Sequence, residues 1–180
     1  IAAVGGATEF AEAEKLLKER EYEAAIEKLK LADEKGHPEA MYVIGLLNEQ
    51  GKGRWFSSDS DALANYRKAA SPPFNNAKAQ YKMGLFYEEG RGGLDRDIVK
   101  ALEWYKKAAL QKNPDGLFRV GMALKNGDGN EPVDYEKMIR CFTEAAQSGL
   151  VEAQYQLGYC YENGIGVPLS IIQAKHWYGR

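Results

Sequence analysis

The chain has 180 residues, of which 44% are hydrophobic and 28% charged, a balance typical of a folded protein and not of a disordered one. Its 24 basic residues stand against 26 acidic ones and form no dense Lys/Arg cluster, so we expect no nucleic-acid partner. No apolar run approaches the ~20 residues that a membrane-spanning helix needs, so we expect no direct membrane insertion.

The first 36 residues contain two segments of different character. Residues 1–7 lack an initiator Met and the basic region of a signal peptide, and we interpret them as a flexible lead-in. Residues 8–35 are rich in Glu and Lys, which indicates solvated helical faces, and they predict a helical hairpin with a tight turn near Arg20–Tyr22.

A single pattern then recurs four times along the chain. Each copy has apolar residues at helical spacing followed by G-x-G, in "AMYVIGLLNEQGKG", "AQYKMGLFYEEGRG", "GLFRVGMALKNGDG" and "AQYQLGYCYENGIG". Successive G-x-G sites are 39, 37 and 37 residues apart. A period of this length is typical of a solenoid built from helical hairpins.

The glycines of these copies predict two roles. A phosphate-binding G-x-G follows a strand, whereas each G-x-G here follows a helix, so we interpret it as a helix C-cap and turn in which glycine adopts positive φ. Interior glycine costs roughly 1 kcal/mol relative to Ala, and we therefore expect another helix backbone to approach closely at the glycine in the middle of each helix. These glycines are Gly45, Gly84, Gly121 and Gly158.

After each of the first three turns, a second helix is predicted to end in paired alanines, in "ALANYRKAA", "ALEWYKKAA" and "MIRCFTEAA". Small residues at a fixed place allow neighbouring helices to approach closely. Asp97 and Asp134 are candidate N-caps of such helices, and Ser170 with Gln173 forms a candidate capping box.

The combined pattern, A-x-[YF]-x-[LIVM]-G, G-x-G and A-x-x-W-Y-x-x-A-A, resembles the Sel1-like repeat family, a relative of the tetratricopeptide repeats. The best single match is "AQYQLGYCYENGIGVPLSIIQAKHWY". The resemblance implies an all-α fold, a right-handed superhelical solenoid of antiparallel helical hairpins. We expect a flexible lead-in at residues 1–7, a tetratricopeptide-like capping hairpin at 8–36, and repeats at 37–73, 74–112, 113–149 and 150–180. Because the last copy stops before its paired alanines, we expect the chain to be a fragment of a longer protein.

In such a solenoid, the first helix of each hairpin lines a concave face where a partner can bind. Three positions of each copy share one side of this helix and predict a partner-binding stripe. Its rows are Val43, Lys82, Arg119 and Gln156; Leu46, Leu85, Met122 and Tyr159; and Gln50, Glu89, Asn126 and Asn163. An extended or helical peptide with an acidic group would suit this stripe, its carboxylate near Lys82 and Arg119. The alternative is that the second row belongs partly to the core and the first row is solvated surface.

Other conspicuous side chains point to no catalytic site. Trp55 and Phe56 form either a loop hot spot for a partner or a pair that folds back over helix ends. Neither histidine has a triad or metal-ligand spacing, and we expect no enzyme activity, cofactor or metal site. Cys141 and Cys160 are expected to be reduced core thiols, which with the lack of N-x-[ST] sequons favours a cytoplasmic location.

We therefore expect a protein–protein interaction scaffold or adaptor that binds a partner protein or peptide segment through the concave face. The resemblance leaves two narrower functions open: an adaptor subunit in endoplasmic-reticulum-associated degradation, and a regulator of an enzyme such as a fungal cell-wall synthase. A purely structural subunit of a larger assembly is an alternative from a different class.

Overall fold

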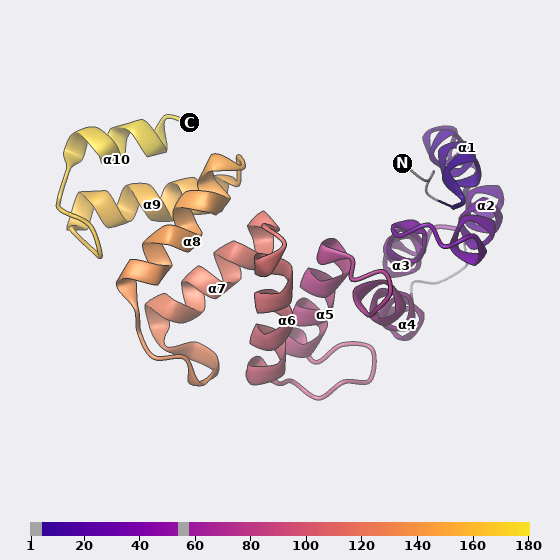
Figure 1. Cartoon of the computed structure of the whole chain (residues 1–180), viewed down its shortest axis with the longest axis horizontal. Coiled ribbons are helices and arrows are strands. Elements are labelled where there is room, and N and C mark those ends of the chain that lie inside the picture. Colours follow the sequence, from indigo (N-terminus) through magenta and orange to yellow (C-terminus); the bar gives the residue numbers. More distant parts are fainter. Residues whose placement is uncertain (1–4, 54–57) are drawn as a thin grey trace. The chain divides into compact units, whose positions relative to one another are not determined.

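Ten α-helices and one short 3₁₀ turn make up the part of the chain that the computed structural model describes, residues 5–53 and 58–180 (Figure 1). No strand occurs in these residues, and within each unit helices that follow one another along the chain pack together. The predicted all-α solenoid fold is thus confirmed. The chain divides into two units, Ile1–Arg96 and Asp97–Arg180.

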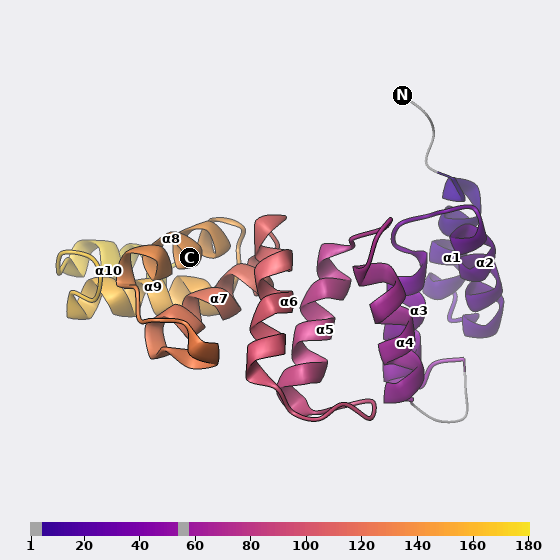
Figure 2. The same ribbon diagram turned by 60° about the horizontal axis from the view of Figure 1, so that its bottom comes forward.

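In the first unit, each helix packs on the next along the chain (Figure 2). The tight turn predicted near Arg20 is confirmed, since α1 ends at Lys18, α2 begins at Tyr22 and Arg20 has a φ of 63°. A buried cluster of Ala13, Leu29, Ile44 and Leu47 joins the first three helices. The helices are α1 (Ala7–Lys18), α2 (Tyr22–Glu34), α3 (Ala40–Gln50), α4 (Asp59–Ala70) and α5 (Ala77–Glu89).

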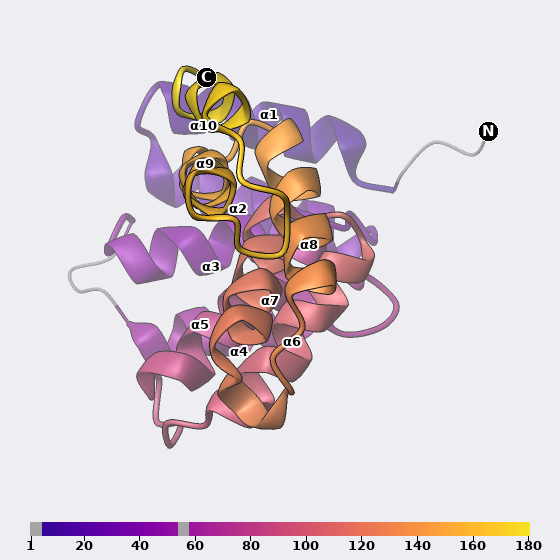
Figure 3. The same ribbon diagram turned by 90° about the vertical axis from the view of Figure 1, so that its left-hand side faces the viewer.

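The second unit repeats this arrangement, and Figure 3 shows α9 and α10 as neighbouring helices. Its core includes Met138, Phe142, Leu157 and Trp177. The elements are α6 (Ile98–Leu110), α7 (Pro114–Asn126), η1 (Asp128–Asn130), α8 (Tyr135–Gln147), α9 (Val151–Asn163) and α10 (Ile171–Tyr178).

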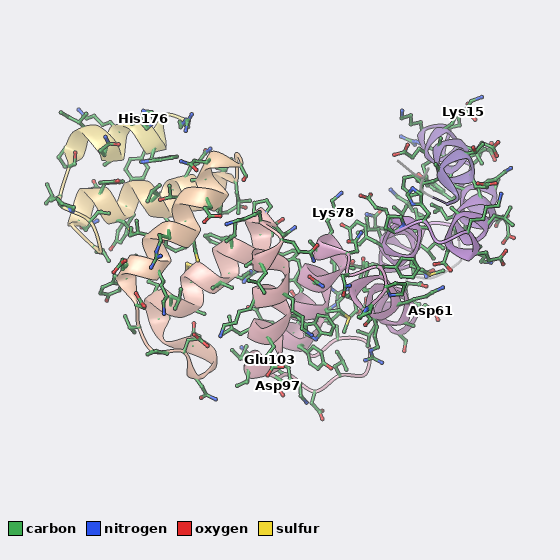
Figure 4. The ribbon with its side chains drawn as sticks, in the orientation of Figure 1. Lys15, Asp61, Lys78, Asp97, Glu103 and His176 are labelled. Carbon is green, nitrogen blue, oxygen red and sulfur yellow. The ribbon has the colours of Figure 1, made fainter. Side chains whose placement is uncertain are left out.

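Side-chain caps begin most of the second helices of the hairpins. The carboxylate of Asp97, which is labelled in Figure 4, accepts from the N–H of Lys100, and that of Asp134 accepts from the N–H of Lys137, so both predicted N-caps are confirmed. Of the two hydrogen bonds that make up the capping box predicted at Ser170, only one forms. The hydroxyl of Ser170 accepts from the backbone of Gln173, but its own N–H donates to the carbonyl of Tyr161 at 2.8 Å.

The G-x-G sites act as turns, as predicted, and they also set the spacing between hairpins. Their first glycines, Gly51, Gly90, Gly127 and Gly164, are left-handed C-caps. The second glycine packs on the second helix of the preceding hairpin, where a Cβ at Gly92 or Gly166 would lie 2.9 Å from a backbone carbonyl oxygen of α4 or α8. A side chain at these positions would therefore push neighbouring hairpins apart.

The interior glycines make room for an aromatic ring and not, as expected, for another helix backbone. A Cβ at Gly45 would lie 2.5 Å from the ring of Tyr66, and one at Gly121 would lie 2.6 Å from the ring of Phe142. Both rings are fully buried. Each ring comes from the second helix of the same hairpin, so the glycine lets the two helices lock together through an aromatic side chain.

We predict that Gly121→Leu lowers the free energy of unfolding by about 1–3 kcal/mol, because the new side chain overpacks the space that Phe142 fills. Urea unfolding followed by circular dichroism measures this change. In a Phe142→Ala background the same leucine fills a cavity, so its cost should fall sharply. An equal cost in both backgrounds would rule out the contact with the ring as the reason for the glycine.

Candidate partner-binding surface

The predicted stripe lies on the first helices α3, α5, α7 and α9 of the hairpins, and its three rows differ in exposure. The first row, Val43, Lys82, Arg119 and Gln156, is half-buried. The third row, Gln50, Glu89, Asn126 and Asn163, is exposed. In the second row Leu46, Leu85 and Met122 are half-buried and Tyr159 is 38% exposed, whereas the residues that follow them, Leu47, Phe86, Ala123 and Cys160, are buried.

In the first unit, the stripe residue Lys82 belongs to a polar network centred on Glu49. One oxygen of the Glu49 carboxylate accepts from the hydroxyl of Tyr66 at 2.6 Å and from Nζ of Lys82 at 2.9 Å. The other oxygen accepts from Nη1 of Arg91 at 3.0 Å, and Arg91 also pairs with Asp59 at 2.7 Å. Lys82 therefore joins α5 to α3, and its charge is already balanced within the fold.

The network shifts the pKa of its members. Burial alone would raise the pKa of Glu49, but hydrogen bonds from Tyr66, Lys82 and Arg91 outweigh it and hold this pKa below its ordinary value. Burial, with the bond to Glu49, raises the pKa of the Tyr66 hydroxyl. Glu49 is thus kept ionised at neutral pH while the hydroxyl of Tyr66 stays protonated.

In the second unit, the position equivalent to Glu49 carries a positive charge in place of a negative one. Lys125 stands where α3 has Glu49, and its Nζ donates to the side-chain oxygen of Gln156 on α9 at 2.9 Å. The same ammonium lies 5.1 Å from the centre of the Tyr159 ring. The guanidinium of Arg119 lies 5.9 Å from the ring of Tyr105. The stripe residues Arg119, Gln156 and Tyr159 thus also contact side chains of their own unit.

Two buried glutamines at the junctions between hairpins were not singled out by the sequence pattern. The amide nitrogen of Gln80 donates to the carbonyl of Ala70 at 3.2 Å, and that of Gln154 donates to the carbonyl of Ala146 at 3.1 Å. Each bond satisfies a carbonyl at the end of the preceding second helix. The sequence signal that could have identified these glutamines is the "AQY" that α5 and α9 share near their N-termini.

The remaining candidate residues form no second site within the described part of the chain. Trp55 and Phe56 lie outside the described residues. His37 stacks on Phe10 at 4.0 Å, and burial lowers its pKa, whereas His176 is exposed and meets the edge of the neighbouring Trp177 (Figure 4).

Neither cysteine forms a disulfide, and burial raises the pKa of both thiols. Across residues 5–53 and 58–180, His, Cys, Asp and Glu side chains do not gather in groups of three or more that could hold a metal ion. In these same residues, each helix is too short or too polar to cross a membrane.

An open depression of about 400 Å³ lies between α6 and α7 in the second unit. Leu110, Leu117 and Val120 form its apolar lining, and Lys106 and Lys112 stand at its edge. Both lysines are paired, with Glu131 and Glu144 respectively. The depression thus offers mainly an apolar surface.

We predict that Glu49→Gln lowers the free energy of unfolding by about 1 kcal/mol at pH 7, because it weakens two charge-assisted hydrogen bonds. A depressed folded-state pKa stabilises the fold above the unfolded-state pKa and loses this effect as pH falls through the folded value. The difference between variant and wild type should therefore shrink as the pH falls below the ordinary glutamate pKa of about 4.3 and disappear only below the lower pKa that Glu49 has in the folded chain.

Urea unfolding at a series of pH values checks this expectation. The matched control is Glu103→Gln, which neutralises an exposed glutamate on α6 (Figure 4). A stability difference for Glu49→Gln that stays constant from pH 7 to acid would contradict the role assigned to the ionised carboxylate.

Comparison with known proteins identifies the repeat. The family model described as "Sel1 repeat" matches residues 38–71, 77–113, 114–150 and 151–180. The crystal structure of a Sel1 repeat protein from Oxalobacter formigenes is similar, with a TM-score of 0.81 and 31% identity, covering 94% of this chain and 68% of that one. The sequence-based resemblance is therefore confirmed across four repeats.

Two further proteins are similar over different lengths. The crystal structure of c5321, a protective antigen of uropathogenic Escherichia coli with an SLR fold, has a TM-score of 0.81 and 28% identity over 97% of this chain and 37% of that one. The chitin synthase regulator SKT5 of Malassezia restricta is 53% identical over 36 residues, which are 20% of this chain and 2% of that regulator. Because the family model covers most of the sequence, the chain belongs to the Sel1 repeat family.

Proposed function

We propose that this chain is a non-enzymatic scaffold that binds a segment of a partner protein along the first helices of its hairpins. Sel1 repeats generally mediate protein–protein interactions and are typically not enzymes. The observation that carries the proposal is the second row of the stripe. Its apolar side chains remain partly accessible beside positions that are fully buried, which is the property of a surface that an apolar partner segment can cover.

Each of the two units carries its own part of this surface. In the first unit, Leu46 and Leu85 supply the apolar contacts, with Gln50 and Glu89 at the exposed edge. In the second unit, Met122 and Tyr159 supply the apolar contacts, with Asn126 and Asn163 at the edge; the amide of Asn163 donates to the carbonyl of Tyr159. Because Lys82 already pairs with Glu49, we expect the partner to be recognised through apolar side chains and not through a carboxylate that binds Lys82.

A narrower candidate is regulation of a membrane-associated synthase. It is supported by the local identity to the chitin synthase regulator SKT5, which spans one repeat length of this chain. Retention of detergent-solubilised chitin synthase by the immobilised chain would support this candidate. Equal recovery of the synthase on an immobilised chain that carries Leu85→Glu and Met122→Glu would indicate that the synthase does not bind through the stripe.

We predict that peptides selected from a displayed library against the folded chain bind at least about tenfold more weakly to Leu85→Glu or Met122→Glu, because a carboxylate then faces the apolar contact. Isothermal titration of each selected peptide measures the loss. The matched control is Val151→Glu, which adds the same charge at a residue that is 69% exposed and outside the stripe. Peptides that lose no affinity for the stripe variants would place the binding surface elsewhere.

A further inference from the structure

One position of the second helices differs between the hairpins of the second unit. The copies "ALEWYKKAA" and "MIRCFTEAA" place Cys141 of α8 where α6 has Trp104, and α10 has Trp177 at the same position. Trp177 is 8% exposed and belongs to the buried core of the unit, whereas Cys141 is half-buried. A thiol therefore stands on α8 where an indole stands on α6 and α10.

The lining of the depression between α6 and α7 has counterparts at the next hairpin junction, where they are covered. Ala109 and Val120 of the lining correspond in the aligned copies to Ala146 and Leu157. Those two residues share one buried cluster with Trp177, and Leu157 is 1% exposed. Val120, in contrast, is only half-buried. The residue that shares a cluster with an indole is thus covered, whereas its counterpart beside the depression is accessible.

Cys141 lies close to the floor of the depression. A Cβ at Gly121, which follows Val120 on α7, would lie 3.4 Å from the Cβ of Cys141. Because a thiol is much smaller than an indole, it leaves room at this junction, and the depression measures about 400 Å³. Pockets of roughly 300–1,000 Å³ hold small organic ligands, so this space is large enough for one indole ring.

Two leucines make this junction more apolar than its counterparts. Leu117 stands where α5 and α9 have Gln80 and Gln154, whose amides bond the end of the preceding helix. Leu110 stands where α8 has Gln147, and it is 84% exposed at the depression. Removing such a side chain from water is favourable, so the lining favours an apolar ligand group.

The two tryptophans of the second unit each have a cation over the ring. Nζ of Lys107 lies 4.1 Å from the centre of the Trp104 ring, and Cζ of Arg180 lies 5.3 Å from the centre of the Trp177 ring. Among aromatic side chains, tryptophan attracts a cation most strongly. An indole that enters the depression would meet the same chemistry, because two lysines stand at its edge.

These edge lysines, Lys106 and Lys112, also suit a carboxylate. Their pairs with Glu131 and Glu144 lie at the surface, and the side chain of Lys112 is 72% exposed. Exposed pairs of this kind contribute little to stability. Each ammonium has three N–H donors, so a carboxylate of a ligand can share them. Charge complementarity thus favours an acidic residue beside the inserted ring.

We propose that the depression binds a segment of a partner protein that inserts a tryptophan side chain and carries an acidic residue next to it. The indole packs on Leu110, Leu117 and Val120, and the carboxylate binds Lys106 and Lys112 at the edge. None of these residues belongs to the stripe, so this site goes beyond the proposed function and does not rest on it.

A short peptide tests the site. The probe is a capped peptide of sequence GEWEG, titrated into the folded chain of residues 1–180 and followed by the amide NMR signals of the chain. We expect saturable shifts of the signals of α6 and α7 at up to about 1 mM peptide. Alanine in place of the peptide's tryptophan should weaken binding at least about tenfold. Lysine in place of both glutamates should weaken it at least about fivefold.

Two variants of the chain fill or charge the site. Cys141→Trp supplies the missing indole from within, so it should abolish peptide binding. Leu110→Glu changes a residue that is 84% exposed and sets a carboxylate against the peptide's glutamates, so it should weaken binding at least about tenfold. The matched control is Leu169→Glu, which makes the same substitution just before α10 at a residue that is 63% exposed, and it should leave binding unchanged.

Circular dichroism checks that each variant is folded, and Leu110→Glu decides alone if Cys141→Trp is not. Three results would overturn the proposal. The first is no saturable shift on α6 or α7 at about 1 mM peptide. The second is equal affinity of the peptide for wild type and Leu110→Glu. The third is a dimer of the chain, seen by analytical ultracentrifugation, that Leu110→Glu dissociates, because a second copy would then occupy the depression.

Discussion

The contact between an interior glycine and an aromatic ring joins the two helices of three hairpins: α3 with α4, α7 with α8, and α9 with α10. Gly45 with Tyr66, Gly121 with Phe142 and Gly158 with Tyr178 bring the second helix close enough for its ring to lie against the first helix backbone. The favourable burial of a large ring offsets the roughly 1 kcal/mol that an interior glycine costs. The position of this ring also determines which side chains the hairpin presents to the helix that follows.

The polar group attached to that ring adds selectivity to the packing. Tyr66 and Tyr178 donate to a glutamate on the first helix of their hairpin, whereas Phe142 has no hydroxyl and stands opposite a first helix that carries Lys125 at the glutamate position. The next helix supplies Lys82 in the first case and Gln156 in the case of Lys125. Repeats with one backbone pattern thus differ in the chemistry of the helix that each accepts.

Local rules explain why much of the fold could be predicted from the sequence. The period of 37 to 39 residues predicts the hairpins, and positive φ at the first glycine of each G-x-G follows from its place after a helix. The sequence does not say what approaches an interior glycine, because a small residue permits either a backbone or a ring. The signal for the difference in charge lies in the aligned copies, which combine Tyr66 with Glu49 and Tyr178 with Glu162, but Phe142 with Lys125.

The stripe was harder to predict because exposure depends on neighbouring helices. Helical spacing places Lys82 on the predicted partner-binding side of α5. Arg91 and Glu49, however, come from a loop and from another hairpin, and only the folded unit brings them together. Similarly, Tyr159 is the exposed residue of the second row, whereas Leu46, Leu85 and Met122 are half-buried. The position within the helix is the same in all four, so helical spacing alone does not predict this difference.

The central claim is that the residue at the Glu49 or Lys125 position selects the residue that the next helix brings. A double-mutant cycle of Lys125→Glu and Gln156→Lys tests it most directly, because the double variant converts this junction to the Glu49–Lys82 pair. We expect Gln156→Lys to destabilise the chain in urea and the added Lys125→Glu to restore stability, with a coupling of at least about 0.5 kcal/mol. Effects that add within about 0.3 kcal/mol would contradict the claim.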